Sequence, residues 1–181
     1  MKSTRDDAME GDLTAMRRYA RALARDHHDA DDVVQDALVR AIERQQTFQP
    51  ERSRRRWLLA IVHNVFISGR RRAAAEARRN DSFAETLLAH VEPEQEHRAR
   101  LTQIAHAFAA LTDHHRAVAH LILVEGFSYQ EAADVLEIPI GTVMSRLARA
   151  RAALRAVEQE MPENGQKQTH ARLRVVGGQD D

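Results

Sequence analysis

The stretch 126–155, with the sequence GFSYQEAADVLEIPIGTVMSRLARARAALR, constrains the fold more than any other part of the chain. Ser128 is followed three residues later by Glu131, which forms the capping-box signature of a helix start. A tight turn is expected from Glu137, and Pro139 suits the first position of a second helix. Apolar residues recur at helical spacing on both sides of this turn. The stretch therefore predicts two short helices joined by a tight turn.

The second of these helices carries a polar and basic face opposite its apolar face. Its polar side chains are Thr142, Ser145, Arg146, Arg149, Arg151 and Arg155. In a DNA-binding helix-turn-helix, the second helix lies in the major groove and reads bases with its N-terminal residues. The alternative is a helical hairpin with a solvated charged face. Because cap, turn and basic face occur together, the pattern favours DNA binding.

Composition favours an all-α protein. Aromatic residues make up only 4% of the 181 residues, and Ala, Leu, Arg and Glu predominate, most of which are strong helix formers. The length allows one ordinary domain or two small ones. No apolar run is long enough to span a bilayer, and the first residues lack the apolar core of a signal peptide. Since cysteine is also absent, we expect a cytoplasmic protein without disulfides or membrane insertion.

The formal net charge is zero, yet the charges are segregated along the chain. Acidic residues concentrate at 26–36 and 85–96, whereas basic residues concentrate at 52–56, 70–79 and 146–155. Local basic patches of this kind are the electrostatic footprint of a nucleic-acid-binding protein. The charge pattern therefore allows a nucleic-acid partner despite the neutral total.

Hydrophobic periodicity divides the chain into two helical blocks. In addition to the two helices of 126–155, we expect helices over about 13–28, 30–42, 53–72, 101–111 and 115–125. The first ten residues are expected to be loosely ordered, 47–53 to be a loop, 73–96 to be a linker with a short helix near 83–91, and the tail after Pro162 to be disordered. Each block is large enough for a small domain with its own modest core.

Three arginines at 54–56 directly follow Ser53, the expected cap of a helix. Cations in the first turn oppose the helix dipole by about 0.3–1 kcal/mol each when exposed, so an anionic partner such as phosphate would resolve the conflict. Phe48 and Trp57 lie nearby in the sequence, and aromatic rings among bases suit single-stranded nucleic acid. Trp57 is in phase with the apolar positions of its helix, which favours a core role. For Phe48, core packing and base stacking are equally compatible with the pattern.

Catalytic and metal sites are not indicated. The histidine pairs at 27–28 and 114–115 are adjacent in sequence and so do not face each other on a helix. The chain has no H-E-x-x-H motif, no Gly-rich phosphate loop and no serine nucleophile elbow. We therefore expect no enzyme activity, no metal and no cofactor.

The order of these motifs resembles the extracytoplasmic-function (ECF, group four) sigma factors of bacterial RNA polymerase. The resemblance covers about 13–154 and rests on three segments, DADDVVQDALVRAIERQQTF, WLLAIVHNVFISGRRR and LTDHHRAVAHLILVEGFSYQEAADVLEIPIGTVMSRLARARAAL. These are similar to the polymerase-binding part of region two, the helix that reads the minus-ten element, and region four. The TFQP loop and NVFIS are further similar to the general-stress group, whose anti-sigma factor is released by a response-regulator mimic.

This resemblance implies a sigma factor of two small helical domains joined by a flexible linker: region two at 1–75, the linker at 76–98, region four at 99–160 and a disordered tail at 161–181. The implied polymerase-binding residues are Asp29, Asp32, Gln35 and Asp36. Those implied for the minus-ten element are Phe48, Arg52, Arg54, Arg55, Asn64, Ser68, Arg70, Arg71 and Arg72, with the loop 48–55 capturing a flipped base. Those implied for the minus-thirty-five element are Ser128, Tyr129, Thr142, Ser145, Arg146 and Arg149. The implied partners are core RNA polymerase, promoter DNA and an anti-sigma factor.

The sequence departs from the family pattern at three positions. Ser68 stands where Asp is usual, and Met144 stands where a phosphate-binding Lys is usual. Glu137 occupies a turn position usually held by Gly or Asn, where a left-handed conformation costs about 1–2 kcal/mol for other residues. Two alternatives remain beside a sigma factor: a sigma mimic that titrates an anti-sigma factor, and a stand-alone helix-turn-helix regulator.

Overall fold

The computed structural model describes residues 4–24, 26–51, 53–80 and 96–159, and every segment of regular structure in these ranges is helical. The elements are α1 (Thr4–Leu23), α2 (His27–Glu43), η1 (Gln45–Thr47), α3 (Arg54–Asn80), α4 (Glu96–Ala110), α5 (Asp113–Ala119), η2 (His120–Val124), α6 (Tyr129–Leu136) and α7 (Ile140–Gln159). The predicted all-α fold class is confirmed.

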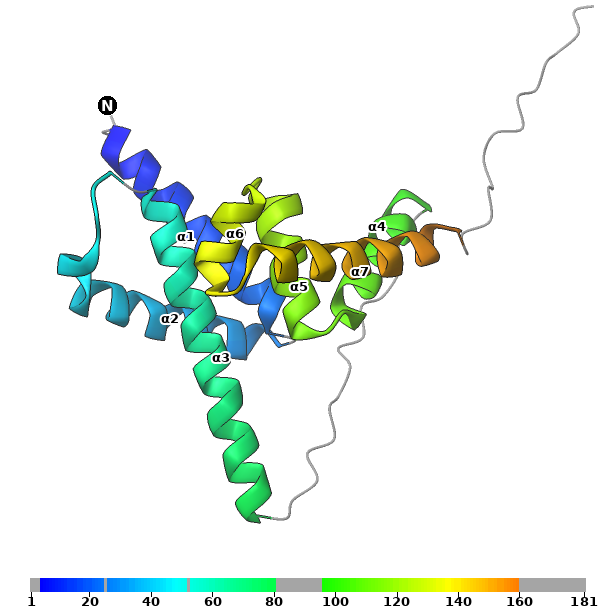
Figure 1. The fold of residues 1–181 in the computed structure, drawn as a ribbon, viewed down its shortest axis with the longest axis horizontal. Helices are drawn as coiled ribbons and strands as arrows, with labels where there is room; N and C mark the ends of the chain where they lie inside the picture. The colour runs from blue at the N-terminus through cyan, green and yellow to red at the C-terminus, as the bar shows by residue number, and fades with distance from the viewer. Residues whose placement is uncertain (1–3, 25, 52, 81–95, 160–181) are drawn as a thin grey trace, which may run out of the picture.

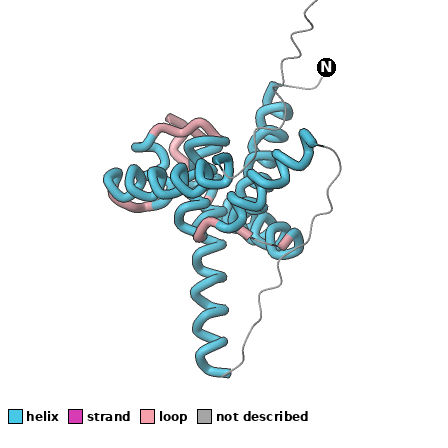
Figure 2. The backbone as a smooth tube through the Cα atoms, turned by 90° about the vertical axis from the view of Figure 1, so that its right-hand side faces the viewer, coloured by secondary structure: helices cyan, strands magenta, loops and turns pink. Residues whose placement is uncertain are grey.

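Helices α1, α2 and α3 pack together and form what we call the N-terminal unit. Each contributes apolar residues at helical spacing, and the buried set includes Ala15, Met16, Tyr19, Leu23, Ala30, Val34, Ala37, Leu59, Val62 and Val65. The second half of α3 projects away from the other helices (Figure 1 and Figure 2). Its side chains from Ser68 to Arg78 are exposed.

Helices α4 to α7 form the C-terminal unit, in which α7 packs against α4, α5 and α6. The predicted capping box is confirmed: Ser128 Oγ accepts from the Glu131 backbone N–H at 3.2 Å, and Glu131 Oε2 accepts from the Ser128 N–H at 2.9 Å. Glu137 ends α6 in the left-handed region, with φ 53° and ψ 44°. The turn therefore has the geometry for which Gly or Asn is preferred.

The two units pack directly on one another. Helix α1 contacts α5 and η2, while α3 contacts α6, and Figure 1 shows α6 beside the upper half of α3. Buried residues of both units, such as Tyr19 and Val62 on one side and Val118 and Leu121 on the other, belong to a single apolar cluster. The units therefore share a core across their boundary.

Two helices are longer than the sequence predicted. Helix α1 begins at Thr4 and not near Leu13, and α3 continues to Asn80, beyond the expected end at 70–72. The extension of α3 is rich in strong helix formers, and neither extension has apolar periodicity, so both helices continue from their packed parts without an apolar stripe to mark them. The short helix expected near 83–91 and the tail from 161 lie outside the described residues.

Candidate polymerase and nucleic-acid interfaces

The candidate polymerase residues lie along one solvent-facing side of α2. Asp29, Asp32, Gln35 and Asp36 are all exposed, because the apolar stripe on the opposite side of α2 faces the core. Large apolar side chains continue this surface toward the end of the helix, namely Leu38, Val39 and Ile42, of which Ile42 is 69% exposed. We call this acidic and apolar set the α2 surface. Exposed apolar residues beside charges are typical of protein contact sites.

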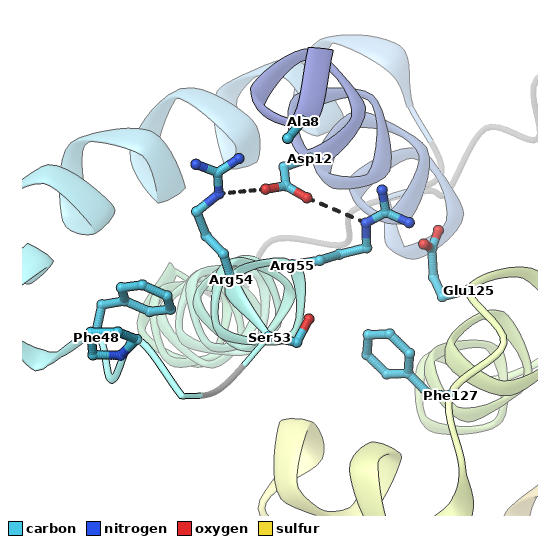
Figure 3. A pocket seen from close by; sticks show the side chains of 9 residues that line it. Ala8, Asp12, Phe48, Ser53, Arg54, Arg55, Glu125 and Phe127 are labelled. Carbon is cyan, nitrogen blue, oxygen red and sulfur yellow. Dashed lines mark hydrogen bonds and ion pairs between the residues drawn. The ribbon is translucent and has the colours of Figure 1, made fainter. Parts of the chain in front are cut away.

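The loop before α3 lines an open pocket of about 640 Å³ between the two units (Figure 3). Its walls are Ala8, Asp12, Phe48, Pro50, Ser53, Arg54, Arg55, Glu125 and Phe127. Three candidate minus-ten residues, Phe48, Arg54 and Arg55, are thus brought together, whereas Arg52 lies outside the described residues. The lining from the C-terminal unit, Glu125 and Phe127, was not predicted.

Asp12 changes the interpretation of the arginines that start α3. Its carboxylate lies between Arg54 and Arg55, with Nε to oxygen distances of 2.6 and 3.4 Å (Figure 3). Ser53 caps this helix as predicted, since its Oγ accepts from the Arg56 N–H at 3.4 Å. The anion that the first-turn cations require is therefore supplied within the chain. The sequence contains a signal for this contact, because Asp12 falls in phase with the apolar stripe of α1.

Phe48 and Trp57 contact each other, with ring centroids 5.4 Å apart and planes inclined by 50°. Trp57 packs against the apolar cluster, in agreement with the core role favoured by its spacing. Phe48 is half-buried and covers the outer side of the pair. The Phe48 ring therefore remains partly accessible beside the pocket.

The exposed part of α3 carries the remaining candidate minus-ten residues. Asn64, Ser68, Arg70, Arg71 and Arg72 are all exposed. Asn64 and Arg70 already contact acidic residues of the C-terminal unit. Asn64 Nδ2 donates to Glu137 Oε1 at 3.3 Å, and Arg70 Nε lies 3.2 Å from Asp113 Oδ2.

Helix α7 presents the candidate minus-thirty-five residues. Val143, Leu147 and Ala150 are buried and fix the rotation of the helix. Ser145 and Arg149 are consequently exposed, and Thr142 and Arg146 are half-buried. Ser128 and Tyr129, at the start of α6, are exposed as well. This arrangement leaves the N-terminal part of α7 accessible to a DNA groove.

A buried polar chain joins the two units and was not predicted from the sequence. Tyr19 Oη lies 3.1 Å from His63 Nδ1, and the Tyr19 ring lies 5.2 Å from the ring of His120. His120 Nε2 is 3.2 Å from Glu125 Oε1, which also accepts from Arg18 Nη2 at 2.6 Å. The π-helical turn η2 places His120 and Glu125 together, because the Glu125 N–H donates to the His120 carbonyl five residues earlier.

Burial shifts the pKa values of the side chains in this buried polar chain. It lowers the pKa of His63 to about 4, with smaller effects from His114 and Arg146 of the C-terminal unit. Burial also lowers the pKa of His120, against the opposing effect of the Glu125 carboxylate, and raises the pKa of Tyr19. At neutral pH His63 is therefore uncharged where it meets the C-terminal unit.

Within the described residues, no group of three or more His, Asp or Glu side chains has the arrangement of a metal site. The same ranges contain no helix of the length and apolarity needed to cross a membrane.

Comparisons with known proteins assign both units. The family described as the Sigma2 domain of PhyR matches residues 9–63, and the family described as Sigma-70, region 4, matches residues 101–154. The ECF RNA polymerase sigma factor EcfG of Rhodopseudomonas palustris is 33% identical over 156 residues, which cover 86% of this chain and 84% of EcfG. The chain belongs to the ECF RNA polymerase sigma factors. As a sigma factor, it acts with core RNA polymerase and promoter DNA to direct transcription initiation.

Other sigma factors extend this assignment. SigC of Mycobacterium tuberculosis is 34% identical over 127 residues, covering 70% of this chain and 69% of SigC. Among solved structures, RpoE in complex with the anti-sigma factor NepR from Bartonella quintana has a TM-score of 0.70 and 29% identity, covering 86% of this sigma factor and 96% of that chain. The structure of CnrH in complex with the cytosolic domain of CnrY has a TM-score of 0.59 and 28% identity, covering 87% of this sigma factor and 90% of that chain.

Proposed function

We propose that this sigma factor contacts the promoter at two places and the polymerase at a third. The observation that carries the proposal is the position of the family matches: the region-two match contains the α2 surface and the loop before α3, and the region-four match contains the capped helix-turn-helix. Each unit therefore presents exposed residues of the chemistry that its assigned region needs.

The α2 surface is proposed to bind core polymerase. Asp29, Asp32 and Asp36 provide charge for basic groups of the clamp helices, and Gln35 provides an amide between them. Leu38, Val39 and Ile42 add exposed apolar area at one end, and burial of apolar area favours protein–protein association.

The minus-ten element is proposed to contact the loop before α3 and the exposed face of α3. Phe48 offers a ring for stacking beside the pocket, and the arginines at 54–55 and 70–72, with Arg52, offer cations for phosphates. Asn64 and Ser68 offer hydrogen bonds on the same helix.

The minus-thirty-five element is proposed to contact α7 and the start of α6. Ser145, Arg146 and Arg149 reach the groove and its phosphates, with Thr142, Ser128 and Tyr129 at its edge. We propose that region two spans residues 1–75 and region four spans residues 99–160. Residues 76–98 form the linker between them, and residues 161–181 form a tail that belongs to neither region.

We propose regulation by an anti-sigma factor in a general stress response. The support is the similarity to EcfG and to RpoE, whose solved structure is a complex with the anti-sigma factor NepR. We further propose that the protein is cytoplasmic, as binding to polymerase requires, and that it has no catalytic activity of its own.

Run-off transcription with core polymerase and a genomic template library tests this function. We expect initiation at a limited set of start sites that share two upstream elements. Arg149→Ala should reduce initiation at these sites, whereas Arg155→Ala, an exposed arginine near the other end of α7, should change it little. Initiation no greater than that of core polymerase alone would refute the proposal.

A sigma mimic is the second candidate, because residues 9–63 match the Sigma2 domain of PhyR. A mimic would bind an anti-sigma factor and yet tolerate Arg149→Ala without loss of activity in cells. A sigma factor would lose transcription from its promoters with the same variant.

A further inference from the structure

The first three turns of α7 expose apolar side chains where a recognition helix reads bases. Ile140 is 40% exposed and Met144 is 47% exposed, and Ala148, one turn further along, is exposed as well. Residues four apart lie on one face of a helix, so these three side chains form a row that we call the α7 apolar row. Single exposed apolar side chains need no explanation, but a row on this helix does.

Packing within the chain does not account for the α7 apolar row. The buried side of α7 is made by Val143, Leu147 and Ala150, each at most 2% exposed. Met144 lies outside this buried stripe and keeps almost half of its surface in solvent. A Cβ placed at the neighbouring Gly141 would meet nothing within 4 Å. This face of the helix is therefore open to a partner of α7.

A second row runs beside the α7 apolar row, through Gly141, Ser145 and Arg149. Ser145 and Arg149 are both exposed. Ser145 Oγ donates to the Thr142 carbonyl at 3.0 Å, so it is left as an acceptor for groups outside the helix. Arg149 offers donors for a phosphate or for guanine. The exposed face of α7 is therefore polar along one row and apolar along the next.

The major groove of DNA offers a specific match to an apolar row. Its base edges present hydrogen-bond donors and acceptors together with one apolar substituent, the C5-methyl of thymine. An apolar side chain that covers a donor or acceptor leaves that group without a partner, which is costly, whereas contact with the methyl removes apolar surface from water. The adenine paired with this thymine presents an amino donor, which suits the acceptor at Ser145.

Met144 stands where a phosphate-binding Lys is usual in the family. A Lys carries its charge on a flexible four-carbon stem, so it can extend past the base edges to a phosphate. The Met side chain has no charge, but its flexible, polarizable thioether fits irregular apolar surfaces. Phosphate contacts carry no sequence information. The change from Lys to Met therefore replaces a contact that is independent of sequence with one that can depend on the base.

We propose that Met144 contacts the C5-methyl of a thymine in the minus-thirty-five element and thereby selects an A·T pair at that position. Ile140 and Ala148 extend the apolar surface on either side of the contact. This role of Met144 rests on the proposed function, because it requires α7 to enter the major groove of that element. It adds the residue that determines specificity and the base that it selects.

Replacement of thymine by deoxyuridine tests the contact, because the two bases differ only in the C5-methyl. The protein is the holoenzyme formed by the full chain and core polymerase. The probe is the duplex promoter of the strongest start site found by run-off transcription, in which each thymine of the upstream element, on either strand, is replaced singly. At one position we expect the wild type to bind about fourfold more weakly without the methyl, as for one apolar carbon removed from water.

Variants of two methionines assign the effect to one side chain. Met144→Ala should bind the thymine and deoxyuridine duplexes equally, whereas Met144→Leu should retain a difference, because Leu supplies apolar surface of similar size. Met9→Ala is the matched control: Met9 is 62% exposed on α1, and its variant should keep the full fourfold difference. The urea midpoint of Met144→Ala should equal that of the wild type, since substitution of an exposed side chain changes stability little.

Equal binding of the wild type to both duplexes at every position overturns the role of Met144, and so does an upstream element without thymine on either strand. A methyl effect that persists in Met144→Ala also overturns it. If Arg149→Ala reduces initiation while the methyl has no effect, the proposed function stands and the methyl contact falls. A holoenzyme that finds no start site contradicts both.

Discussion

Lowering the pH should destabilise the protein through His63, and the expected loss follows from its surroundings. Tyr19 of α1 contacts His63, and His114 of α5 and Arg146 of α7 act on it electrostatically. None of them is an anion that would stabilise an imidazolium. Burial lowers the pKa of His63 from 6.5 to about 4 in the folded protein.

The sign of the effect follows from proton binding. The unfolded chain binds a proton at His63 below pH 6.5, whereas the folded protein does so only below about 4. Stability is therefore lost as the pH falls below 6.5, and the loss levels off near 4. Between about pH 7.5 and about pH 5.5, His63 should remove about 1.3 kcal/mol from the free energy of unfolding.

Urea denaturation at the two pH values measures this loss. In His63→Gln, which keeps a hydrogen-bonding group beside Tyr19, the pH-dependent loss should be smaller by about 1.3 kcal/mol than in the wild type. The exposed His27→Gln is the control and should retain the wild-type dependence. Equal pH dependence in wild type and His63→Gln would refute the assignment of the effect to this buried histidine.

Three further predictions concern single positions. Ser128→Ala removes the capping box of α6 and should lower the free energy of unfolding by about 1 kcal/mol in urea denaturation, while Ser68→Ala, on an exposed helix face, should change it by less than about 0.5 kcal/mol. Met144→Lys introduces the usual phosphate contact of the family, so the slope of log affinity against log salt for duplex promoter DNA should steepen by about one unit; an unchanged slope would show that this side chain lies away from the backbone. Leu59→Ala removes a fully buried side chain and should cost about 2–5 kcal/mol, whereas Ile42→Ala should leave stability unchanged but weaken co-purification with core polymerase. Loss of stability in Ile42→Ala without loss of polymerase binding would contradict the α2 surface.

Local features of this sigma factor could be predicted from the sequence because their causes lie within a few residues. The capping box at Ser128 and Glu131, the cap at Ser53 and the strained turn at Glu137 each depend on the backbone next to them. The exposed positions on α2 and α7 follow from helical periodicity, since one apolar stripe fixes the opposite face.

The ends of α1 and α3 were less predictable. Both continue past their apolar stripes, through exposed residues such as 7–10 and 73–78. Periodicity marks only where a helix is buried, so it placed the start of α1 near Leu13 and the end of α3 near Arg72.

Only the tertiary structure decided how the charges pair. Asp12 lies more than forty positions before Arg54 and Arg55, and Arg18 lies 107 positions before Glu125. An ion pair at such a separation depends on the packing of whole helices, so the local sequence can indicate that Asp12 is buried but does not identify its partners. The same packing buries His63 and turns two candidate DNA-binding residues, Asn64 and Arg70, toward acids of the C-terminal unit. The sequence by itself predicted which residues bind DNA, and the tertiary structure decided which of them pair with acids of the C-terminal unit.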